Sequence, residues 1–522
     1  TGFSNSAGIA IASNAASATG TGNNGNKNVI SNNAIVGGYY GLTAFGTNTT
    51  TFCQNNQFLN NTFNGQAYYG MYLSFQNLVS INENIVDNIL STNVSSMGMR
   101  FEYVERFEIK KNKINRAGNY GMYFNFANYQ LGSGIDKSEI SNNMIGGIFY
   151  STNPYGINIT SGGCRNINFF HNSISVMNAG FGYAFQMQYS TSGNYGGLVF
   201  KNNSFVVYNG SQYAGYFYWQ TSGMTPAQPI DSFKNNNIWN SNTGATQAVF
   251  GQNGYNTNGW ISPSTNGLNT STCLWVDPLY INPSTNLHTI SGALSNNGTN
   301  IPTITTDIDG DTRPLSPSST VDIGADEFNV PAENIGAFAV ISPTLPLVTG
   351  LQDVIVQIKN FGSATITSAN VRYKVGAGGT TRTIAWTGSI ATNATANVTF
   401  TGVNQYNFTG SYDTVIAWTD APNGLPDGYL ANDTTSSMVC QSLNGVYTMD
   451  TTLPASATNF VNFNSIATKL NNCGVSGPVT INIANGTYSE QFTLNQIYGA
   501  SATNTVTFQS ASGIAANVVI QF

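Results

Sequence analysis

The stretch Phe200-Lys201-Asn202-Asn203-Ser204-Phe205 shows the pattern that repeats through the first half of the chain. It consists of an apolar residue, two spacers, an asparagine, one spacer and a second apolar residue, and it occurs eight times between Ile30 and Ile238. Its asparagines are Asn33, Asn56, Asn84, Asn112, Asn143, Asn172, Asn203 and Asn236, at steps of 23, 28, 28, 31, 29, 31 and 33 residues. Steps of this size predict the turns of a parallel β-solenoid with loops of variable length.

Asparagine suits such a repeat because its side chain both donates and accepts hydrogen bonds. Copies at the same bend of successive coils would stand about 4.8 Å apart, the spacing of neighbouring strands, where a charged side chain would repel its own copy. We therefore expect the eight asparagines to stack as a ladder at an inward bend, with the flanking apolar residues in the core. A second apolar strand follows in most coils and is led by Gly41, Gly70, Gly98, Gly121, Gly156 and Gly215. Two strand signals per period favour a parallel β-helix.

The composition argues against several classes of function. Of the 522 residues only 8% are charged, 41% are hydrophobic and 55 residues are glycine. The net charge of −6 and the lack of clustered Lys and Arg argue against nucleic-acid binding. No apolar run reaches the roughly 18 residues that a membrane span needs, so we expect no membrane insertion of this segment.

The cysteines are odd in number and form no CxxC pair, which argues against a zinc site or a disulfide scaffold. They are Cys53, Cys164, Cys273, Cys440 and Cys473. We expect most of them to be core residues, with Cys53 at a core-facing position of the repeat. Cys440 and Cys473 could form a disulfide in an oxidising compartment, and this alternative stays open.

The repeat fades after Ile238, and residues 251–330 have the character of a closing segment that contains DPLYINPSTNLHTIS and DIDGDTRPLSPSSTVDIGADEF. The pairing of these stretches resembles the C-terminal end of the right-handed β-helix, pectate-lyase-like domains of large secreted bacterial surface proteins. The resemblance implies that residues 1–330 are the C-terminal portion of a right-handed parallel β-helix. It also implies export by the type IX route and an extracellular location at the cell surface.

Residues 331–440 change character, with alternating apolar runs separated by turn residues that predict a β-sandwich. The stretch VIVQIKNFGSATITSANVRYKV resembles the immunoglobulin-like spacers of extracellular bacterial proteins. In residues 441–522 an amphipathic helix is predicted by Phe463, Ile466, Ala467 and Leu470. The following GPVTINIANGTYSEQFTL resembles the N-terminal cap of another pectate-lyase-like β-helix. We expect an all-β chain with one short capping helix, and we interpret it as a window from a much longer polypeptide.

Three carboxylates stand at alternate positions in Asp307-Ile308-Asp309-Gly310-Asp311, as they do in calcium-binding loops. The loop departs from the EF-hand pattern, because glycine is fourth rather than sixth and Ser318 stands where the last glutamate should be. In the alternative interpretation Asp309 or Asp311 pairs with Arg313, and the closing turn is held by Asp322, Asp326 and Glu327. A similar choice applies to Asp420, Asp427 and Asp433. Calcium is the one cofactor that the sequence suggests.

The sequence contains few residues that could carry out catalysis. The one dense charge cluster could supply the base of a polysaccharide lyase, but its mixed signs favour a salt-bridged surface; it comprises Arg100, Glu102, Glu105, Arg106, Glu108, Lys110, Lys111, Lys113 and Arg116. Glycosidases of this fold need paired aspartates, and the aspartates before Trp260 are Asp87, Asp136 and Asp231, far apart in sequence. His171 and His288 are the only histidines, too few for a Ser-His-Asp triad or a histidine metal site. We expect His171 to be an ordinary exposed residue.

Aromatic residues recur in the second strands, where half of them should point outward. Outward tyrosines could form a stripe for sugar rings or for another protein, with Tyr72, Tyr123, Tyr183, Tyr216 and Tyr218 as candidates; interior aromatic stacks are the alternative. We expect a non-enzymatic structural and adhesive segment of a very large extracellular protein or filament. Its partners would be other copies of the chain and surface glycans or proteins. The alternatives are a polysaccharide lyase or glycosidase of β-helix fold, and a carbohydrate-binding rod.

Overall fold

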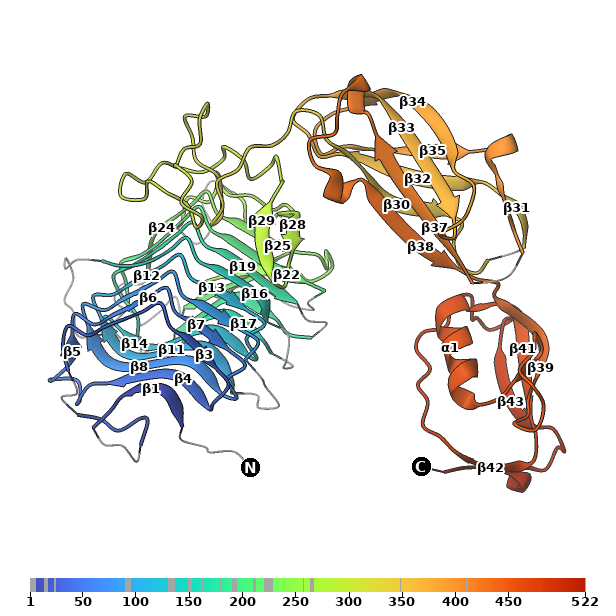
Figure 1. Cartoon of the computed structure of the whole chain (residues 1–522), viewed down its shortest axis with the longest axis horizontal. Helices are drawn as coiled ribbons and strands as arrows, with labels where there is room; N and C mark the ends of the chain where they lie inside the picture. Colours follow the sequence, from blue (N-terminus) through green and yellow to red (C-terminus); the bar gives the residue numbers. More distant parts are fainter. Residues whose placement is uncertain are drawn as a thin grey trace. The chain divides into compact units, whose positions relative to one another are not determined.

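The computed structural model describes residues 6–13, 17–22, 25–89, 95–129, 137–148, 153–160, 163–177, 180–189, 195–209, 213–219, 229–256, 258–262, 267–347, 349–409 and 412–521. The chain divides into two compact units, Thr1–Asn329 and Val330–Phe522. The first unit is a parallel β-solenoid (Figure 1), so the fold predicted from the repeated phrase is confirmed at this level. Among the described residues no helix is long and apolar enough to cross a membrane.

Three parallel sheets wrap the solenoid, and most coils contribute one strand to each. The first sheet contains Val29–Ser31 (β2), Gln57–Leu59 (β6), Ser80–Asn82 (β9), Glu108–Lys110 (β12), Ser138–Ser141 (β15), Ile167–Phe170 (β18), Leu198–Lys201 (β21) and Ile230–Lys234 (β24). The second sheet contains Ala34–Val36 (β3), Thr62–Asn64 (β7), Ile85–Asp87 (β10), Lys113–Asn115 (β13), Met144–Ile148 (β16), Ser173–Met177 (β19), Ser204–Tyr208 (β22) and Asn237–Asn240 (β25).

The third sheet has the longest strands. It contains Ala7–Ile11 (β1), Tyr40–Phe45 (β4), Tyr69–Asn77 (β8), Met97–Glu105 (β11), Tyr120–Ala127 (β14), Tyr155–Ile159 (β17), Tyr183–Tyr189 (β20), Gly215–Trp219 (β23) and Thr246–Phe250 (β26). Cys53–Gln54 (β5) pairs with β8, and Asn253–Asn256 (β27) pairs antiparallel with β26. The core between the sheets is filled by apolar side chains in register, such as Phe169 and Phe200, whose rings stack with centroids 4.6 Å apart.

A column of glycines in register explains five of the six glycines expected to lead the strands of the third sheet: Gly41, Gly70, Gly98, Gly121 and Gly156. The expectation is wrong for Gly215, which pairs with Phe185 one position later, and Ala184 holds the column position in β20. A Cβ atom on Gly98 would lie 2.7 Å from the backbone oxygen of Gly121 in the next coil, and equally close to Cγ2 of Ile114. Carbon atoms do not approach other atoms this closely. The column therefore lets the third sheet run close to the second at their shared corner.

The closing segment lies along the outer face of the second sheet. Its hairpin, Tyr280–Asn282 (β28) and Asn286–Thr289 (β29), contacts β16, and β29 also contacts β19. An apolar cluster outside the main core joins the two layers and contains Met144, Val206, Tyr280, Leu287, Ile308 and Ala325. The segment therefore covers a side of the solenoid.

His171 is fully buried, so the expectation of an exposed residue is wrong. Its Nδ1 lies 3.3 Å from the backbone oxygen of Gly324, and its Nε2 lies 2.8 Å from Nδ2 of Asn202. The residue sits on the surface of its own coil, and the closing segment covers it from more than a hundred residues away in sequence. The sequence around His171 contains no signal of its contact with the closing segment.

The second unit begins with antiparallel sheets around one core. One sheet contains Ile335–Ser342 (β30), Val354–Asn360 (β32) and Thr395–Phe400 (β35). The other contains Arg382–Ile390 (β34), Ile366–Val375 (β33), Asp413–Asp420 (β37) and Thr434–Val439 (β38), and Gly350–Gln352 (β31) pairs separately with Tyr406–Phe408 (β36). Tyr373 and Phe400 join the two larger sheets through an edge-to-face ring contact at 4.7 Å. Short 3₁₀ turns cover Gly402–Asn404 (η1), Pro422–Gly424 (η2) and Leu430–Asn432 (η3).

The rest of the unit is mainly parallel. One sheet contains Asn459–Phe460 (β40), Leu443–Met449 (β39), Val475–Ile483 (β41) and Val506–Ser510 (β43), while Gly486–Ser489 (β42) pairs with Val518–Gln521 (β44), which follows the turn Ala515–Asn517 (η4). The helix Phe463–Cys473 (α1) begins after Asn462, whose side chain accepts the N–H of Ser465 at 2.7 Å. The four apolar positions that predicted this helix are buried, and Phe463, Ile466 and Leu470 contribute to a core shared with β39 and β41.

The structure decides the alternative that the sequence left open for Cys440 and Cys473. Cys440 and Cys473 form a disulfide that joins the end of β38 to the last residue of α1. Cys53, Cys164 and Cys273 are free and buried.

Candidate ligand-binding face

The bend between the first and second sheets carries a continuous asparagine ladder. At each of its seven steps, the backbone N–H and side-chain Nδ2 of one asparagine both donate to Oδ1 of the next. Its members are Asn33, Asn61, Asn84, Asn112, Asn143, Asn172, Asn203 and Asn236. Seven of the eight predicted asparagines stand in this row. The prediction is wrong for Asn56, whose place is taken by Asn61.

Asn56 was misplaced because the repeated phrase occurs twice in its coil, and the second copy overlaps the first at Phe58. The strand register pairs Phe58 with Ile30, so the residue three positions after Phe58 reaches the bend. Asn56 lies in a shorter row of its own. Its Oδ1 accepts two hydrogen bonds from Asn28, and its Nδ2 donates to Gln76 at 2.8 Å.

The residue before every ladder asparagine has a left-handed backbone. These residues are Asn32, Asn60, Glu83, Lys111, Asn142, His171, Asn202 and Asn235, with φ between 51° and 60°. Asparagine tolerates this conformation better than most residues. The bend turns the following side chain inward, which explains the frequent Asn-Asn pairs in the repeat.

The outer face of the third sheet carries two parallel rows of side chains in register. The first row, directly before the glycine column, contains Tyr40, Tyr69, Met97, Tyr120, Tyr155 and Tyr183. The second row, three positions later, contains Thr43, Tyr72, Arg100, Tyr123, Asn158, Gln186 and Tyr216. We call these rows, together with Gln188 and Tyr218, the tyrosine face. All five tyrosines proposed from sequence are on it, partly exposed.

The rings of the two rows are oriented differently. Tyr155 stacks between Tyr120 and Tyr183, with centroids 4.9 and 5.0 Å apart and planes within 8° of parallel. The tyrosines of the second row stand nearly perpendicular to those of the first, at 83° for Tyr123 against Tyr120 and 76° for Tyr216 against Tyr183. In the first row, the ring faces of Tyr120, Tyr155 and Tyr183 therefore contact one another, whereas the rings of the second row do not extend this stack.

A hollow of about 470 Å³ opens where the second row changes from tyrosine to shorter amides. It is lined by Tyr120, Tyr123, Tyr155, Asn158, Ile159, Thr160, Gln186 and Gln188. Nδ2 of Asn158 donates to Oε1 of Gln186 at 2.7 Å, while Oδ1 of Asn158 is buried without a hydrogen-bond partner. A buried acceptor without a partner is costly. Because this oxygen is buried, a ligand hydroxyl can donate to it and remove the cost only if the Asn158 side chain turns toward the hollow.

The hollow contains no Asp, Glu, Lys, Arg or His among its lining residues. Burial raises the pKa of Tyr183, beside the hollow, to about 12, and it also raises the pKa of Tyr120 and Tyr155. These phenols therefore stay neutral near neutral pH. The lining offers neutral donors, neutral acceptors and aromatic carbon, which is the chemistry that recognises an uncharged, hydroxyl-rich ligand.

Arg100 of the tyrosine face is fully engaged. Its Nη1 donates to the hydroxyl of Tyr69 at 2.7 Å, and its guanidinium lies 4.9 Å from the ring centroid of Tyr72 and 5.2 Å from that of Tyr123. It pairs with Glu102, whose other oxygen accepts from the hydroxyl of Tyr72 at 2.8 Å. This network neutralises the charge inside the face.

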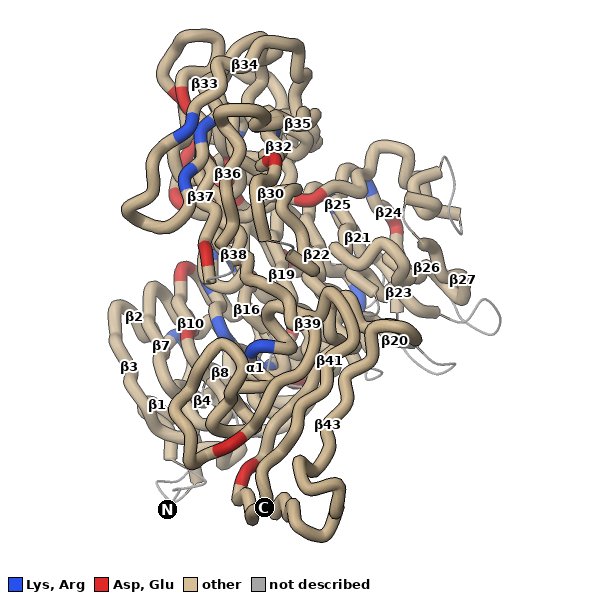
Figure 2. Tube along the Cα trace, turned by 90° about the vertical axis from the view of Figure 1, so that its right-hand side faces the viewer, with Lys and Arg blue, Asp and Glu red and all other residues tan. Residues whose placement is uncertain are grey.

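Each cation of the dense charge cluster has a polar partner. Charged residues are sparse along the described part of the trace (Figure 2). Besides Arg100, the partners are Asn77 for Arg106, Glu108 and Glu139 for Lys110, Thr306 for Lys111, Asp309 for Lys113 and Asp87 for Arg116. Asp231 pairs with Lys137, and Asp136 lies outside the described residues. The aspartates of the solenoid therefore form no catalytic pair among the residues that the structure describes.

The structure does not gather the three predicted calcium carboxylates. Asp307 is fully buried, and its Oδ1 accepts the N–H groups of Asp309, Gly310 and Asp311 at 2.8–2.9 Å. Its Oδ2 accepts the N–H of Glu327 at 3.0 Å. Asp307 therefore shapes the loop from within.

The alternative interpretation of this loop needs one correction. Arg313 pairs with Glu327 at 2.6 Å, fully buried, and not with Asp309 or Asp311. Asp322 accepts the N–H groups of Asn296 and Phe328, and Asp326 accepts that of Thr289. These carboxylates hold the closing turn through backbone N–H groups.

The second aspartate set does not bring three ligand atoms together, although Asp433 lies close enough to Asp427 and Asp420 that burial and their charges raise its pKa to about 7. Asp420 binds Asn370 and Arg372, whereas Asp427 accepts the N–H groups of Ile335 and Tyr429. Within the described parts of the chain, the one group that can offer three ligand atoms within 4.8 Å of one another is His288, Asp309 and Asp326.

No protein-family model, no curated protein and no solved structure matches this chain. The geometry of the tyrosine face therefore carries the functional argument.

Sequence reasoning pointed to Tyr123 but missed most of the residues that line the hollow: Tyr155, Asn158, Ile159, Thr160, Gln186 and Gln188. A signal was present, because tyrosine directly precedes the column glycine at Gly41, Gly70, Gly121 and Gly156. When the coils are aligned on this first tyrosine, Asn158 and Gln186 lie three residues after it, at a position where other coils carry a second tyrosine.

Proposed function

We propose that this chain is a non-enzymatic, adhesive segment of an extracellular protein, in which the solenoid is a stiff rod and the tyrosine face binds neutral glycans. The observation that carries the proposal is the hollow between Tyr123 and Gln186, with its unpaired Asn158 Oδ1 and uncharged lining. Stacked strands at about 4.8 Å per coil give the rod a length of about 40 Å. A polymeric ligand could lie across several coils of such a face.

The absence of free charge in the hollow favours binding of a neutral sugar over cleavage of an acidic one. A lyase needs a basic group beside the uronate, whereas the cations of the cluster from Arg100 to Arg116 are each held by a partner. An inverting or retaining glycosidase needs two carboxyl groups on either side of the bond. The hollow has no carboxylate in its lining.

The remaining modules support an extracellular, multi-domain setting. A disulfide between Cys440 and Cys473 suits an oxidising compartment. We infer that residues 331–440 form an immunoglobulin-like spacer, that the solenoid is right-handed as parallel crossovers usually are, and that α1 caps the start of a second β-helix. Together with the sequence resemblance, these inferences support a surface adhesin or filament exported by the type IX route, with lateral contacts to other copies of the chain.

The test incubates the purified chain with neutral polysaccharides and with uronate-containing ones, with and without calcium, and measures both retention and cleavage. The proposal expects retention on at least one neutral polysaccharide, with no new reducing ends and no unsaturated product. Cleavage of any polymer would contradict the non-enzymatic proposal. Retention by uronate polymers alone would contradict the assignment of a neutral ligand.

A further inference from the structure

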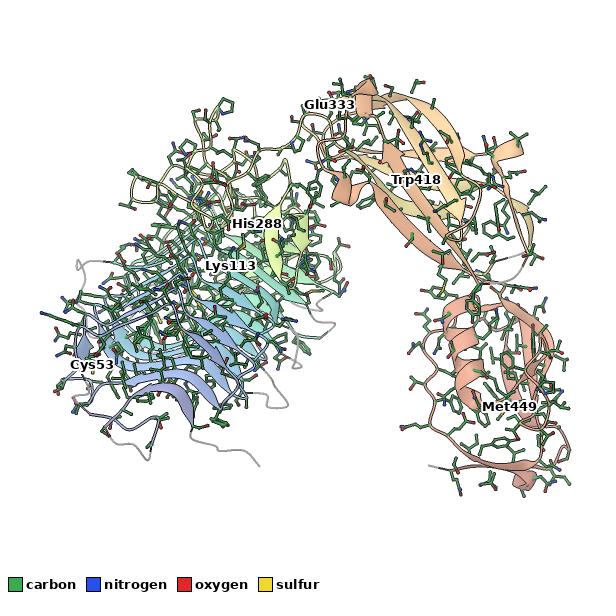
Figure 3. The ribbon with its side chains drawn as sticks, viewed as in Figure 1. Cys53, Lys113, His288, Glu333, Trp418 and Met449 are labelled. Atoms are coloured by element: carbon green, nitrogen blue, oxygen red, sulfur yellow. A yellow bond between two sulfur atoms is a disulfide. The ribbon has the colours of Figure 1, made fainter. Side chains whose placement is uncertain are left out.

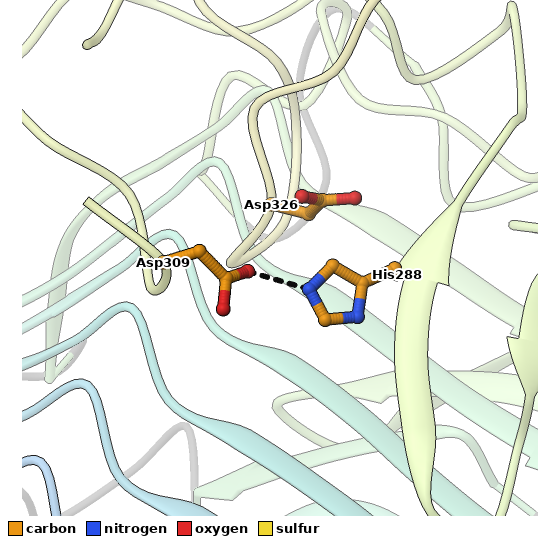
Figure 4. Close-up of side chains that lie close together, drawn as sticks. All are labelled: His288, Asp309 and Asp326. Carbon is orange, nitrogen blue, oxygen red and sulfur yellow. Dashed lines mark hydrogen bonds and ion pairs between the residues drawn. The ribbon is translucent and has the colours of Figure 1, made fainter. Parts of the chain in front are cut away.

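Three segments of the closing region bring a histidine and two aspartates together beside the second sheet. His288 lies on β29, Asp309 lies in the turn closed by the bridge between Thr306 and Thr312, and Asp326 lies in the tail that follows. One ligand atom from each of the three lies within 4.8 Å of the others (Figure 4). This group is separate from the tyrosine face on the third sheet, and the inference drawn from it goes beyond the proposed function.

The imidazole of His288 is oriented by Asn286. Oδ1 of Asn286 accepts the backbone N–H of His288 at 3.1 Å, which identifies it as an acceptor, and it also contacts Nδ1 of the ring. Nδ1 therefore carries the ring proton in the neutral form, and the lone pair is on Nε2. In metal-binding histidines the ring nitrogen that does not bind the metal usually donates a hydrogen bond of this kind, which sets the tautomer and the orientation of the ring.

Nε2 of His288 faces the carboxylates. It lies 2.5 Å from Oδ2 of Asp309. At this hydrogen-bond distance a proton on Nε2 bridges the nitrogen and the carboxylate in the metal-free chain. A metal ion that displaces this proton would hold the two atoms farther apart, because each bond from zinc to nitrogen or oxygen is about 2.0–2.2 Å long. A metal ion can satisfy the nitrogen and both carboxylates at once, whereas a proton can bridge only one pair.

The surroundings carry an excess of negative charge. Asp326 is 7% exposed, and its Oδ2 accepts one backbone N–H at 3.2 Å. Asp307 lies nearby with both oxygens used by backbone N–H groups. Burying carboxylates is costly unless a cation compensates them.

The buried Arg313 also lies near these carboxylates but is paired with Glu327, so the cation that contacts the group itself is Lys113. Lys113 extends from β13, and its Nζ lies 3.0 Å from Oδ1 of Asp309. Lys113 and His288 are labelled in Figure 3. Lys113 occupies the outer oxygen of Asp309 and leaves Oδ2 directed at His288. The side chains of His288 and Asp309 are 29% and 39% exposed, so an ion and its water ligands can reach the site.

We propose that His288, Asp309 and Asp326 bind one divalent transition-metal ion of the zinc class through Nε2 and one oxygen of each carboxylate. An imidazole nitrogen with two carboxylates suits zinc, whereas calcium takes oxygen ligands in larger number. The ion connects the β28–β29 hairpin, the turn between Thr306 and Thr312, and the tail that contains Asp326. It thereby cross-links three parts of the closing segment beside the solenoid. Its role is structural, because it cross-links three segments that otherwise meet through few ionic contacts.

The test uses the full chain, stripped with EDTA and titrated with zinc chloride at pH 7.5 by calorimetry, followed by desalting and elemental analysis. We expect one zinc ion per chain and a rise of the melting temperature of the solenoid unit. His288→Gln and Asp309→Asn should each weaken binding at least tenfold and lose the rise. Asp311→Asn, in the same turn but outside the group, is the matched control and should bind as the parent chain does.

Two further readouts keep the test decisive. The melting temperatures of all variants in EDTA show whether they are folded, and Asp309→Asn changes a partly exposed residue that is not part of the core. The spectrum of the cobalt-substituted chain should lack the thiolate charge-transfer band that binding to Cys53, Cys164 or Cys273 would give. No bound zinc, unchanged binding in folded His288→Gln and Asp309→Asn, a thiolate band, or binding of calcium in place of zinc would each overturn the proposal.

Discussion

The backbone N–H and the side-chain Nδ2 of Asn143 both donate to Oδ1 of Asn172, at 3.1 and 2.9 Å. Oδ1 of Asn143 receives the same pair of hydrogen bonds from Asn112. Each ladder asparagine thus satisfies the main chain of the coil before it. The ladder connects every coil to the next through buried polar groups, whose loss cannot be compensated by water.

Asn143→Ala should destabilise the solenoid by about 3 to 5 kcal/mol, because several buried donors and acceptors lose their partners at about 1–3 kcal/mol each. The measurement is chemical unfolding followed by circular dichroism. Asn168→Ala is the control, since Asn168 is a partly exposed residue of β18, and it should cost about 0.5 kcal/mol or less. Equal costs for the two variants would show that the ladder adds no stability.

Gly98→Ala should destabilise the same unit by about 2 kcal/mol, because the new methyl group would meet the backbone oxygen of Gly121 at 2.7 Å. Gly244→Ala is the matched control. Its Cβ would have Oδ1 of Asn242 as nearest neighbour, at 3.5 Å. The free energies of unfolding of both variants are compared with that of the parent chain. A neutral Gly98→Ala would mean that the two sheets are less closely packed at this corner than described.

The disulfide should stabilise the region around α1. Cys440 and Cys473 are 33 residues apart, and closing a loop of this size removes about 4 kcal/mol of unfolded-state entropy. Hydrogen exchange of residues 463–473 should accelerate in the double variant Cys440→Ala, Cys473→Ala. A reductant should accelerate exchange in the parent chain but not in the double variant. An effect of reductant on both would point to another cause.

His171 should make the solenoid sensitive to acid. Burial lowers the pKa of His171 well below 6.5, so below pH 6.5 the unfolded chain binds a proton that the folded chain does not. Stability from this group is therefore present above about pH 6.5 and is lost as the pH falls, by at most about 1.4 kcal/mol per pH unit. We predict that the midpoint of chemical unfolding falls between pH 7 and pH 5 more in the parent chain than in His171→Asn.

Asparagine is the matched replacement at position 171, because Asn142, Asn202 and Asn235 hold the same left-handed position in other coils. The difference between the two chains isolates His171 from other titrating groups, such as Asp322, whose pKa is raised by burial to about 7. Parallel pH profiles of the two chains would contradict a buried, neutral His171.

The repeating parts of this fold could be predicted from sequence because each coil presents the same local signal. Ile109, Ile140 and Phe169 recur at one position of the phrase, and the structure places them in register. The phrase failed only at Asn56, where two overlapping copies offered two registers and the pairing of Phe58 with Ile30 decided between them. A single coil does not contain that information.

The candidate sites were harder to predict, because they depend on contacts between distant segments. The tyrosines of the outer face could be chosen by strand alternation, but the hollow arises from the amides of Asn158 and Gln186 standing beside tyrosines of neighbouring coils. His288 and Asp326 meet Asp309 only because the closing segment turns back on itself. Residue spacing in the acidic loop pointed instead to Asp307, which the folded loop uses internally.

The most direct test of the account is affinity electrophoresis of the intact chain in gels that contain a neutral polysaccharide, with Asn158→Ala and Tyr155→Ala beside the parent chain. Asn168→Ala, on the outer face of the first sheet, serves as the matched control. The account predicts that the polysaccharide retards the parent chain and Asn168→Ala equally, and that both variants of the hollow lose at least tenfold in affinity while remaining folded. Equal retardation of all four chains, or of none on any neutral polysaccharide, would contradict the assignment of the tyrosine face as a glycan-binding surface.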